Sequence, residues 1–165
     1  MIDKIGLSLL TMFGIGRIKY APGTVASIVT CLIYYLLFSL GVNFNYFFFF
    51  IFIILLIYSI ILIDKLSHHF KEKDPKEIVI DEFFGQSIPL VWMSGYIISS
   101  GEVYPFFLAF ILFRFFDIYK PFPINIVDKK MKNGLGVMLD DIIAGIYTGI
   151  TILIFSFVYT IYYGY

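Results

Sequence analysis

Residues 112–132 read LFRFFDIYKPFPINIVDKKMK, where a long apolar run gives way to charged residues. Arg114, Asp117 and Lys120 follow one another at intervals of three, so they lie on one broad side of a helix. The prolines of the Lys-Pro-Phe-Pro segment that starts at Lys120 then end this helix. The stretch therefore predicts a helix that leaves an apolar environment and presents charged side chains at its end.

The composition indicates that the apolar environment is a membrane. Of the 165 residues, 60% are hydrophobic and 21% aromatic, and the mean hydropathy is +0.91, whereas soluble domains are about 45–50% apolar. The length suits one domain over residues 1–165. Because the formal net charge is zero, no overall field favours a nucleic-acid partner. Cys31 is alone, which excludes an intrachain disulfide and gives no sign of a cysteine-ligated zinc site.

The apolar runs predict an all-α, integral-membrane helical bundle of about five transmembrane or partly re-entrant helices plus a short N-terminal helix. A helix needs about 20 residues to cross a bilayer, with a range of about 17–25. The predicted segments are an interfacial helix within Met1–Phe13, spans over Thr24–Leu40 and Tyr46–Ile63, weaker runs over Phe83–Ser100 and Pro105–Phe116, and a last helix from about Asp140 to Tyr163. The two weaker runs are either two crossings or one re-entrant hairpin, so the chain crosses five times or three.

The positive charges orient this bundle. All 12 Lys and Arg residues fall before residue 20, within 65–76, or within 114–132. An excess of Lys and Arg marks the cytoplasmic side of a membrane protein. With five crossings or with three, the N-terminus is then inside and the C-terminus outside. His68 and His69 belong to the second charged segment, and we expect them to be solvated loop residues.

Three acidic sites occur at the ends of apolar runs: Asp81-Glu82, Asp117 and Asp140-Asp141. Both crossing models place all three on the cytoplasmic face. Carboxylates at such positions are costly to desolvate unless they are paired or bind a cation, and oxygen-only ligand sets suit Mg²⁺. The alternative is a structural role, in which each acid caps a helix or pairs with a nearby lysine; the expected place of Asp140-Asp141 is the first turn of the last helix.

Basic groups accompany these acids. Arg114 and Lys120 flank Asp117, and guanidinium and ammonium groups bind phosphate. The competing explanation is that both anchor the end of a span on its positive side. The Ala-Pro-Gly-Thr turn that ends at Thr24 opens the first span, where backbone N–H groups form an anion site. Its alternative is a plain helix start with Thr24 or Ser27 as the cap.

Several phosphatase chemistries lack their residues in this sequence. There is no Cys followed by Arg for a cysteinyl-phosphate, no Asp-x-Asp motif for an aspartyl-phosphate, and no Gly-Lys-Ser/Thr phosphate loop. The histidines also lack the Arg-rich setting of lipid phosphatases that form a phosphohistidine. Metal-bound water is the economical nucleophile that remains.

Four sequence blocks, taken in order, resemble the phosphatidylglycerophosphatase A family. They are Ala21-Pro22-Gly23-Thr24 with Ser27, Ile80-Asp81-Glu82 with Gly85, Phe113–Asp117 with Lys120–Ile124, and Gly134–Asp141 with Ala144-Gly145. The resemblance extends from about Phe13 to Gly149. It implies a Mg²⁺-dependent, multi-pass enzyme of the bacterial inner (cytoplasmic) membrane, with its active site on the cytoplasmic face. Such an enzyme removes the terminal phosphate of phosphatidylglycerophosphate to give phosphatidylglycerol.

The resemblance implies that the acidic and basic residues of these blocks are important, and more weakly Thr24; the roles given next are our hypothesis for them. The expected catalytic residues are Asp81, Glu82, Asp117 and Asp141, with Asp141 or Glu82 as general base. The expected ligands of one or two Mg²⁺ ions are Asp81, Glu82, Asp117, Asp140 and Asp141. The expected phosphate-binding residues are Arg114, Lys120 and, more weakly, Thr24. The hypothesis is that metal-activated water attacks phosphorus while the lipid tails stay in the bilayer.

Two further expectations concern partners and alternatives. Gly145 and Gly149 are four residues apart, a spacing that lets helices approach closely, so they predict a homo-oligomer contact. The competing function is a small transporter or channel subunit with an acidic ion site on the cytoplasmic side. That function predicts acids spread along the depth of the membrane, whereas the phosphatase predicts acids gathered at one side.

Overall fold

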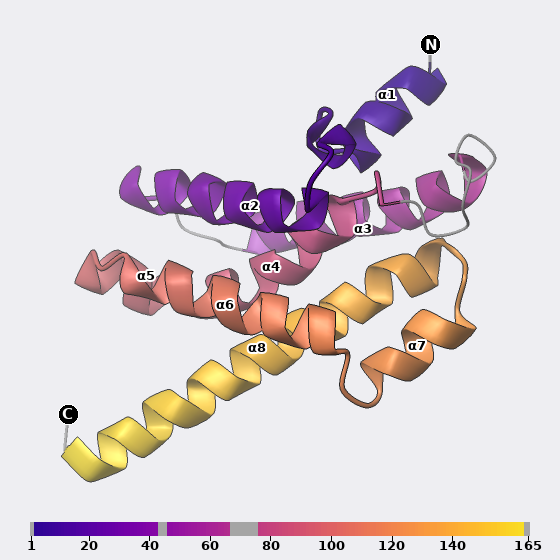
Figure 1. Cartoon of the computed structure of the whole chain (residues 1–165). Coiled ribbons are helices and arrows are strands. Elements are labelled where there is room, and N and C mark those ends of the chain that lie inside the picture. The colour runs from indigo at the N-terminus through magenta and orange to yellow at the C-terminus, as the bar shows by residue number, and fades with distance from the viewer. Residues whose placement is uncertain (1, 43–45, 67–75, 164–165) are drawn as a thin grey trace.

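The computed structural model describes residues 2–42, 46–66 and 76–163, so His68 and His69 lie outside the described residues. Every regular element within these ranges is a helix, which confirms the all-α prediction (Figure 1). The helices are α1 (Ile2–Leu10), the short 3₁₀ helix η1 (Ile15–Arg17), α2 (Pro22–Ser39), α3 (Tyr46–Leu66), α4 (Ile80–Trp92), α5 (Ser94–Ser100), α6 (Tyr104–Tyr119), α7 (Ile124–Lys130) and α8 (Gly134–Tyr163).

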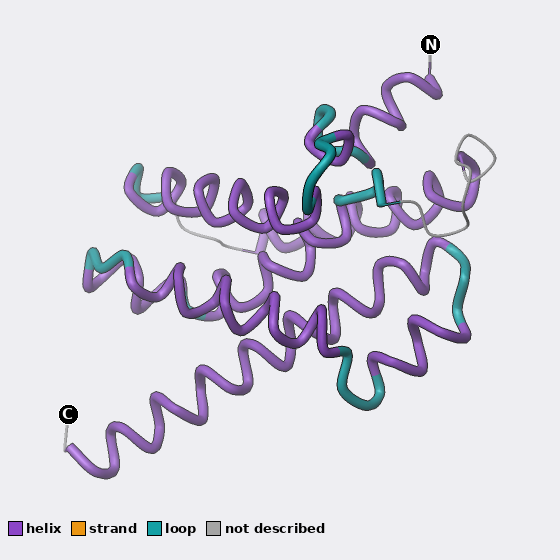
Figure 2. The backbone as a smooth tube through the Cα atoms, viewed as in Figure 1, coloured by secondary structure: helices purple, strands orange, loops and turns teal. Residues whose placement is uncertain are grey.

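Three of the described helices, α2, α3 and α8, are long and apolar enough to cross a membrane (Figure 2). The region between α3 and α8 is built from shorter pieces. α4 has 13 residues and contains Pro89, α5 has 7, and α6 has 16. The weaker run predicted over Phe83–Ser100 is therefore two helices that meet at Met93. This is the same region for which the sequence allows either two crossings or a re-entrant hairpin.

The last helix starts earlier than its sequence pattern indicates. α8 begins at Gly134, so Asp140 lies in its second turn and the prediction of a start near Asp140 is wrong. The reason is that other side chains hold the N-terminus. Asp64, at the end of α3, accepts a hydrogen bond from the Gly134 N–H at 2.6 Å, and Asn133 accepts one from the Gly136 N–H at 3.0 Å. Asp140 and Asp141 therefore do not act as first-turn acids.

The long helix α8 crosses the bundle diagonally and packs closely on α4 (Figure 1). At the crossing, a Cβ added to Gly145 would collide with the backbone carbonyl of Gly85, and one added to Gly149 would meet the ring of Trp92. Both α8 glycines are buried in this contact. The expectation that Gly145 and Gly149 pack a second copy of the chain is corrected accordingly, because the same face joins α8 to α4 within one chain.

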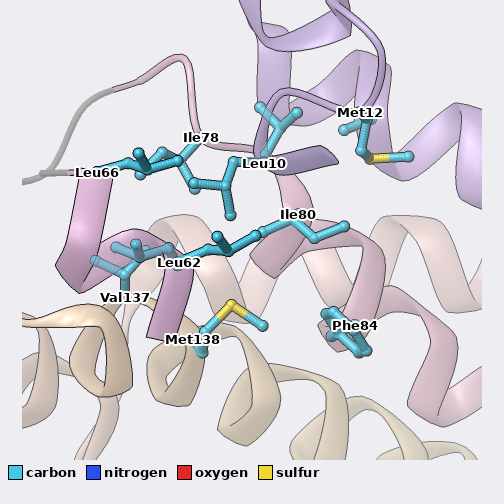
Figure 3. Packing of buried hydrophobic residues seen from close by; sticks show 12 residues of the cluster. Leu10, Met12, Leu62, Leu66, Ile78, Ile80, Phe84, Val137 and Met138 are labelled. Carbon is cyan, nitrogen blue, oxygen red and sulfur yellow. The ribbon is translucent and has the colours of Figure 1, made fainter. Parts of the chain in front are cut away.

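A cluster of buried hydrophobic residues fixes the start of α4 beside α1, α3 and α8 (Figure 3). Leu10, Leu62 and Met138 come from these three neighbours and surround Ile80, the first residue of α4. The N–H of Val79 also donates to the carbonyl of Leu10 at 3.0 Å. Because Asp81 and Glu82 follow directly, the cluster sets the position of the first acidic pair.

We expect Gly145→Ala to destabilise the fold by about 1–3 kcal/mol, since the added methyl group overpacks the α4–α8 contact. Gly95→Ala is the matched control, because a Cβ at Gly95 meets nothing within 4 Å. In a helix, this control change is stabilising by up to about 1 kcal/mol. Denaturant unfolding in detergent micelles measures both variants. Equal stability of the two would contradict the close crossing.

Candidate active site

The predicted site residues meet at one end of the bundle. The start of α2, the first turn of α4, the end of α6 and the second turn of α8 converge there and line a cavity of about 480 Å³. All eight residues predicted for the site lie in its wall: Thr24, Asp81, Glu82, Arg114, Asp117, Lys120, Asp140 and Asp141. Residues up to 117 positions apart in the sequence thus share one cavity, as the phosphatase hypothesis predicts.

Asp81, Glu82 and Asp141 form the tightest acidic group, which we call the carboxylate trio. One oxygen from each lies within 4.8 Å of the other two. Asp81 Oδ1 and Glu82 Oε2 are buried and have no hydrogen-bond partner in the described part of the chain. Burial, followed by the charge of Glu82, raises the pKa of Asp81 well above its usual range, and burial also raises the pKa of Glu82. A proton or a bound cation must therefore offset the charge of this group.

Asp117 is in contact with Asp141 of the trio, but it also has a basic partner. Arg114 lies one turn before it on α6, and the Arg114 Nη1 atom is 2.6 Å from Asp117 Oδ2. The same nitrogen is 3.9 Å from Glu82 Oε1. These contacts aim the guanidinium into the cavity between α4 and α6, and they compensate one of the five carboxylates.

Lys120 compensates a second carboxylate. It ends α6 with a left-handed backbone, φ 46°, and its Nζ atom lies 2.7 Å from Asp140 Oδ2 and 2.9 Å from Asp128 Oδ1. Partial burial alone would lower the pKa of Lys120, but these two acids outweigh it and raise the pKa above its usual range. Asp128, on α7, is absent from the sequence-based set. The sequence gives little indication of its role, because it directly precedes a run of lysines and so resembles an ordinary surface residue.

Thr24 lies in the cavity wall at the start of α2. Neither it nor Ser27 caps this helix, since the cap position is Ala21 and no side chain bonds there. Ser27 is buried and donates instead to the carbonyl of Gly23 at 3.0 Å. A Cβ at Gly23 would collide with the Glu82 carboxylate. The start of α2 therefore approaches the carboxylate trio closely, and its first N–H groups have no side-chain cap.

The donor chemistry of the trio fits a divalent cation. Its members are all carboxylates, the ligand type that Mg²⁺ prefers, and two of their oxygens are buried without a hydrogen-bond partner among the described residues. Asp117 and Asp140 differ, because each forms an ion pair with a basic side chain. The predicted set of five metal ligands thus divides into three candidates for direct contact and two carboxylates held by Arg114 and Lys120.

Comparison with known proteins decides the family. The sequence model of phosphatidylglycerophosphatase A matches residues 8–156. The chain belongs to the phosphatidylglycerophosphatase A family. It is 39% identical over 141 residues to phosphatidylglycerophosphatase A of Haemophilus influenzae, covering 85% of this chain and 82% of the relative. No solved structure matches the chain.

Two further relatives have related names. Phosphatidylglycerophosphatase A of Escherichia coli K12 is 28% identical over 81% of this chain and 73% of its own length. A putative phosphatidylinositol-3-phosphatase of Bacteroides thetaiotaomicron is 32% identical over 87% of this chain and 89% of its own. The chain is accordingly an enzyme, a phosphoric monoester hydrolase, and its substrate is a lipid.

We expect Lys120→Met to lower the free energy of unfolding by about 1–3 kcal/mol, because it leaves the buried Asp140 carboxylate without its ion pair. The double variant Lys120→Met/Asp140→Asn should recover part of that loss. Lys130→Met, an exposed change of the same kind on α7, should stay within about 0.5 kcal/mol of the unchanged protein. Strictly additive single effects in this double-mutant cycle would argue against the pair.

Proposed function

We propose that the chain hydrolyses the terminal phosphate of phosphatidylglycerophosphate, giving phosphatidylglycerol and inorganic phosphate. The observation that carries the proposal is the carboxylate trio beside Arg114 in one cavity at the end of a membrane bundle. Membership of the phosphatidylglycerophosphatase A family supports the choice of this substrate. The location of Lys and Arg supports a cytoplasmic-face site in the bacterial inner membrane.

Asp81, Glu82 and Asp141 would hold Mg²⁺ directly, and Asp117 and Asp140 would act from the next layer as partners of basic groups. The bound ion would neutralise phosphate charge and lower the pKa of a nearby water. This division follows the contacts. Asp81 and Glu82 each have a buried oxygen without a partner in the described part of the chain, and the other two acids form short ion pairs.

The remaining chemistry falls to side chains of this cavity. Arg114, which Asp117 orients, would bind equatorial oxygens of the phosphate and stabilise the charge that develops there. Glu82 or Asp141, through a carboxylate oxygen that does not hold the ion, would accept the proton of the attacking water. The headgroup oxygen would leave opposite that water and take up a proton to become the alcohol of the product. Thr24 and the uncapped start of α2 would add donors to the phosphate.

The contacts of Lys120 favour a structural role, whereas the sequence pattern predicts that it binds phosphate directly. Its ammonium is already in contact with Asp140 and Asp128. It would therefore hold α7 against α8 and lend positive charge to the cavity wall. The ammonium has three N–H donors and uses two of them on these acids, so the third would be left for a phosphate oxygen.

Asp81→Asn, Asp117→Asn and Asp141→Asn should each reduce phosphate release about 100-fold or more, while the protein still inserts in membranes. Asp3→Asn, an exposed change on α1, is the control and should keep its activity. The assay is phosphate release from phosphatidylglycerophosphate in mixed micelles. Near-normal turnover in Asp117→Asn and Asp141→Asn would overturn the assignment.

Removal of divalent cations should abolish turnover, and added Mg²⁺ should restore it. Independently of activity, Mg²⁺ should raise the thermal unfolding midpoint of the unchanged protein and have a much smaller effect on Asp81→Asn, since the ion stabilises only the state that binds it. A chelator that leaves turnover intact would remove Mg²⁺ from the proposal. Ion flux into vesicles without phosphate release would instead favour the transporter.

A further inference from the structure

A second hollow adjoins the active-site cavity. It has a volume of about 410 Å³ and lies between η1 and the segment that leads into α4. Pro22 and Lys76 line both hollows, so the two are adjacent at these residues. None of the residues in the predicted catalytic set lines the second hollow. It is thus a neighbouring space that the proposed reaction leaves unused.

The charge of this hollow differs from that of the active-site cavity. Arg17, Lys19 and Lys76 line it together with one acidic residue, Glu77. Arg17 and Lys76 form no salt bridge with any described residue, while Lys19 lies over the ring of Tyr20, 5.3 Å from its centroid. By contrast, Arg114 and Lys120 in the main cavity are both neutralised by carboxylates. The second hollow therefore attracts anions.

The walls of the hollow are held together by backbone contacts. A Cβ at Gly16 would collide with the carbonyl of Glu77, so η1 lies directly against this segment. Two residues further on, the Val79 N–H donates to the carbonyl of Leu10 at 3.0 Å. These contacts bring Arg17 and Lys76 to the lining of one hollow, although 59 positions separate them in the sequence.

We propose that this second hollow binds the phosphodiester of the lipid substrate while the terminal phosphate occupies the carboxylate cavity. The inference rests on the proposed function. Phosphatidylglycerophosphate has two phosphates: a terminal monoester and a diester that joins the headgroup to the diacylglycerol. The carboxylates repel the second phosphate from their own cavity, and the adjoining cations receive it.

The subsite selects a class of lipid. It favours lipids that carry a headgroup phosphomonoester and a phosphodiester, and it contributes nothing for a lipid whose only phosphate is the monoester. The product, phosphatidylglycerol, keeps the diester and so occupies the second hollow alone. Inorganic phosphate, in contrast, competes for the carboxylate cavity alone. Inhibition by phosphatidylglycerol and inhibition by inorganic phosphate therefore report on the two subsites separately, with the same substrate in both assays.

The test compares Arg17→Gln/Lys76→Gln with the unchanged full-length protein in mixed micelles of neutral detergent. We expect KM for phosphatidylglycerophosphate and the inhibition constant of phosphatidylglycerol each to rise about tenfold or more, with kcat within about twofold. The inhibition constant of inorganic phosphate should stay within the same margin. Lys129→Gln/Lys130→Gln removes the same charge from exposed positions on α7 and should change none of these values.

The other possible results of this test overturn either the subsite or the proposed function. Unchanged KM and phosphatidylglycerol inhibition in the Arg17/Lys76 variant overturn the subsite and leave the proposed function standing. If KM and the inhibition constant of phosphatidylglycerol rise equally in the Lys129/Lys130 control, the subsite is also overturned, because the effect is then general attraction to anionic lipid. The single variant Lys76→Gln, at an exposed position, repeats the test if the double variant does not fold. Absence of turnover in the unchanged protein overturns the proposed function itself.

Discussion

The close approach of α4 and α8 is the contact on which the rest of the structure depends. Gly85 and Gly145 let the two backbones touch, and a Cβ at Gly85 would meet the carbonyl of Asp141 at 2.5 Å. This approach brings Asp141 beside Asp81 and Glu82, which come from the other helix. With a larger residue at the crossing, the helices would separate and the carboxylate trio would open. The small residues therefore serve the active site through the fold, since they set the distance between its two acidic helices.

A second constraint is the cost of burying five carboxylates near one another. An uncompensated buried charge costs several kcal/mol, so each acid needs a proton, a cation or a basic partner. Arg114 and Lys120 supply partners for Asp117 and Asp140. Two of the remaining three carboxylates, Asp81 and Glu82, have a buried oxygen without a hydrogen-bond partner among the described residues, and this is the feature that favours a divalent cation there. The five carboxylates thus divide into two that form structural ion pairs and three that are suited to holding a cation.

Much of the architecture was predictable from local patterns. Apolar runs of sufficient length indicated α2, α3 and α8, and the charged segments between them indicated the face on which the acids lie. The start of α8 was predicted six residues too late, because the caps that hold Gly134 come from the preceding Asn133 and from Asp64 on another helix. The oligomer contact was misassigned for a similar reason. A small-residue face shows that a helix approaches closely, but its partner here is α4 of the same chain.

The sequence by itself determined the helical membrane character, the family and eight of the residues that line the cavity, because hydropathy, proline and glycine positions and charged motifs are local properties of the chain. Only the tertiary structure decided which acids pair with bases and which form the trio. It also placed Asp128 beside Lys120 and brought Arg17 and Lys76 to the lining of one hollow. The physical reason is that ion pairs depend on distances of a few ångströms between side chains on different helices. Those distances follow from helix crossings, which no local pattern specifies.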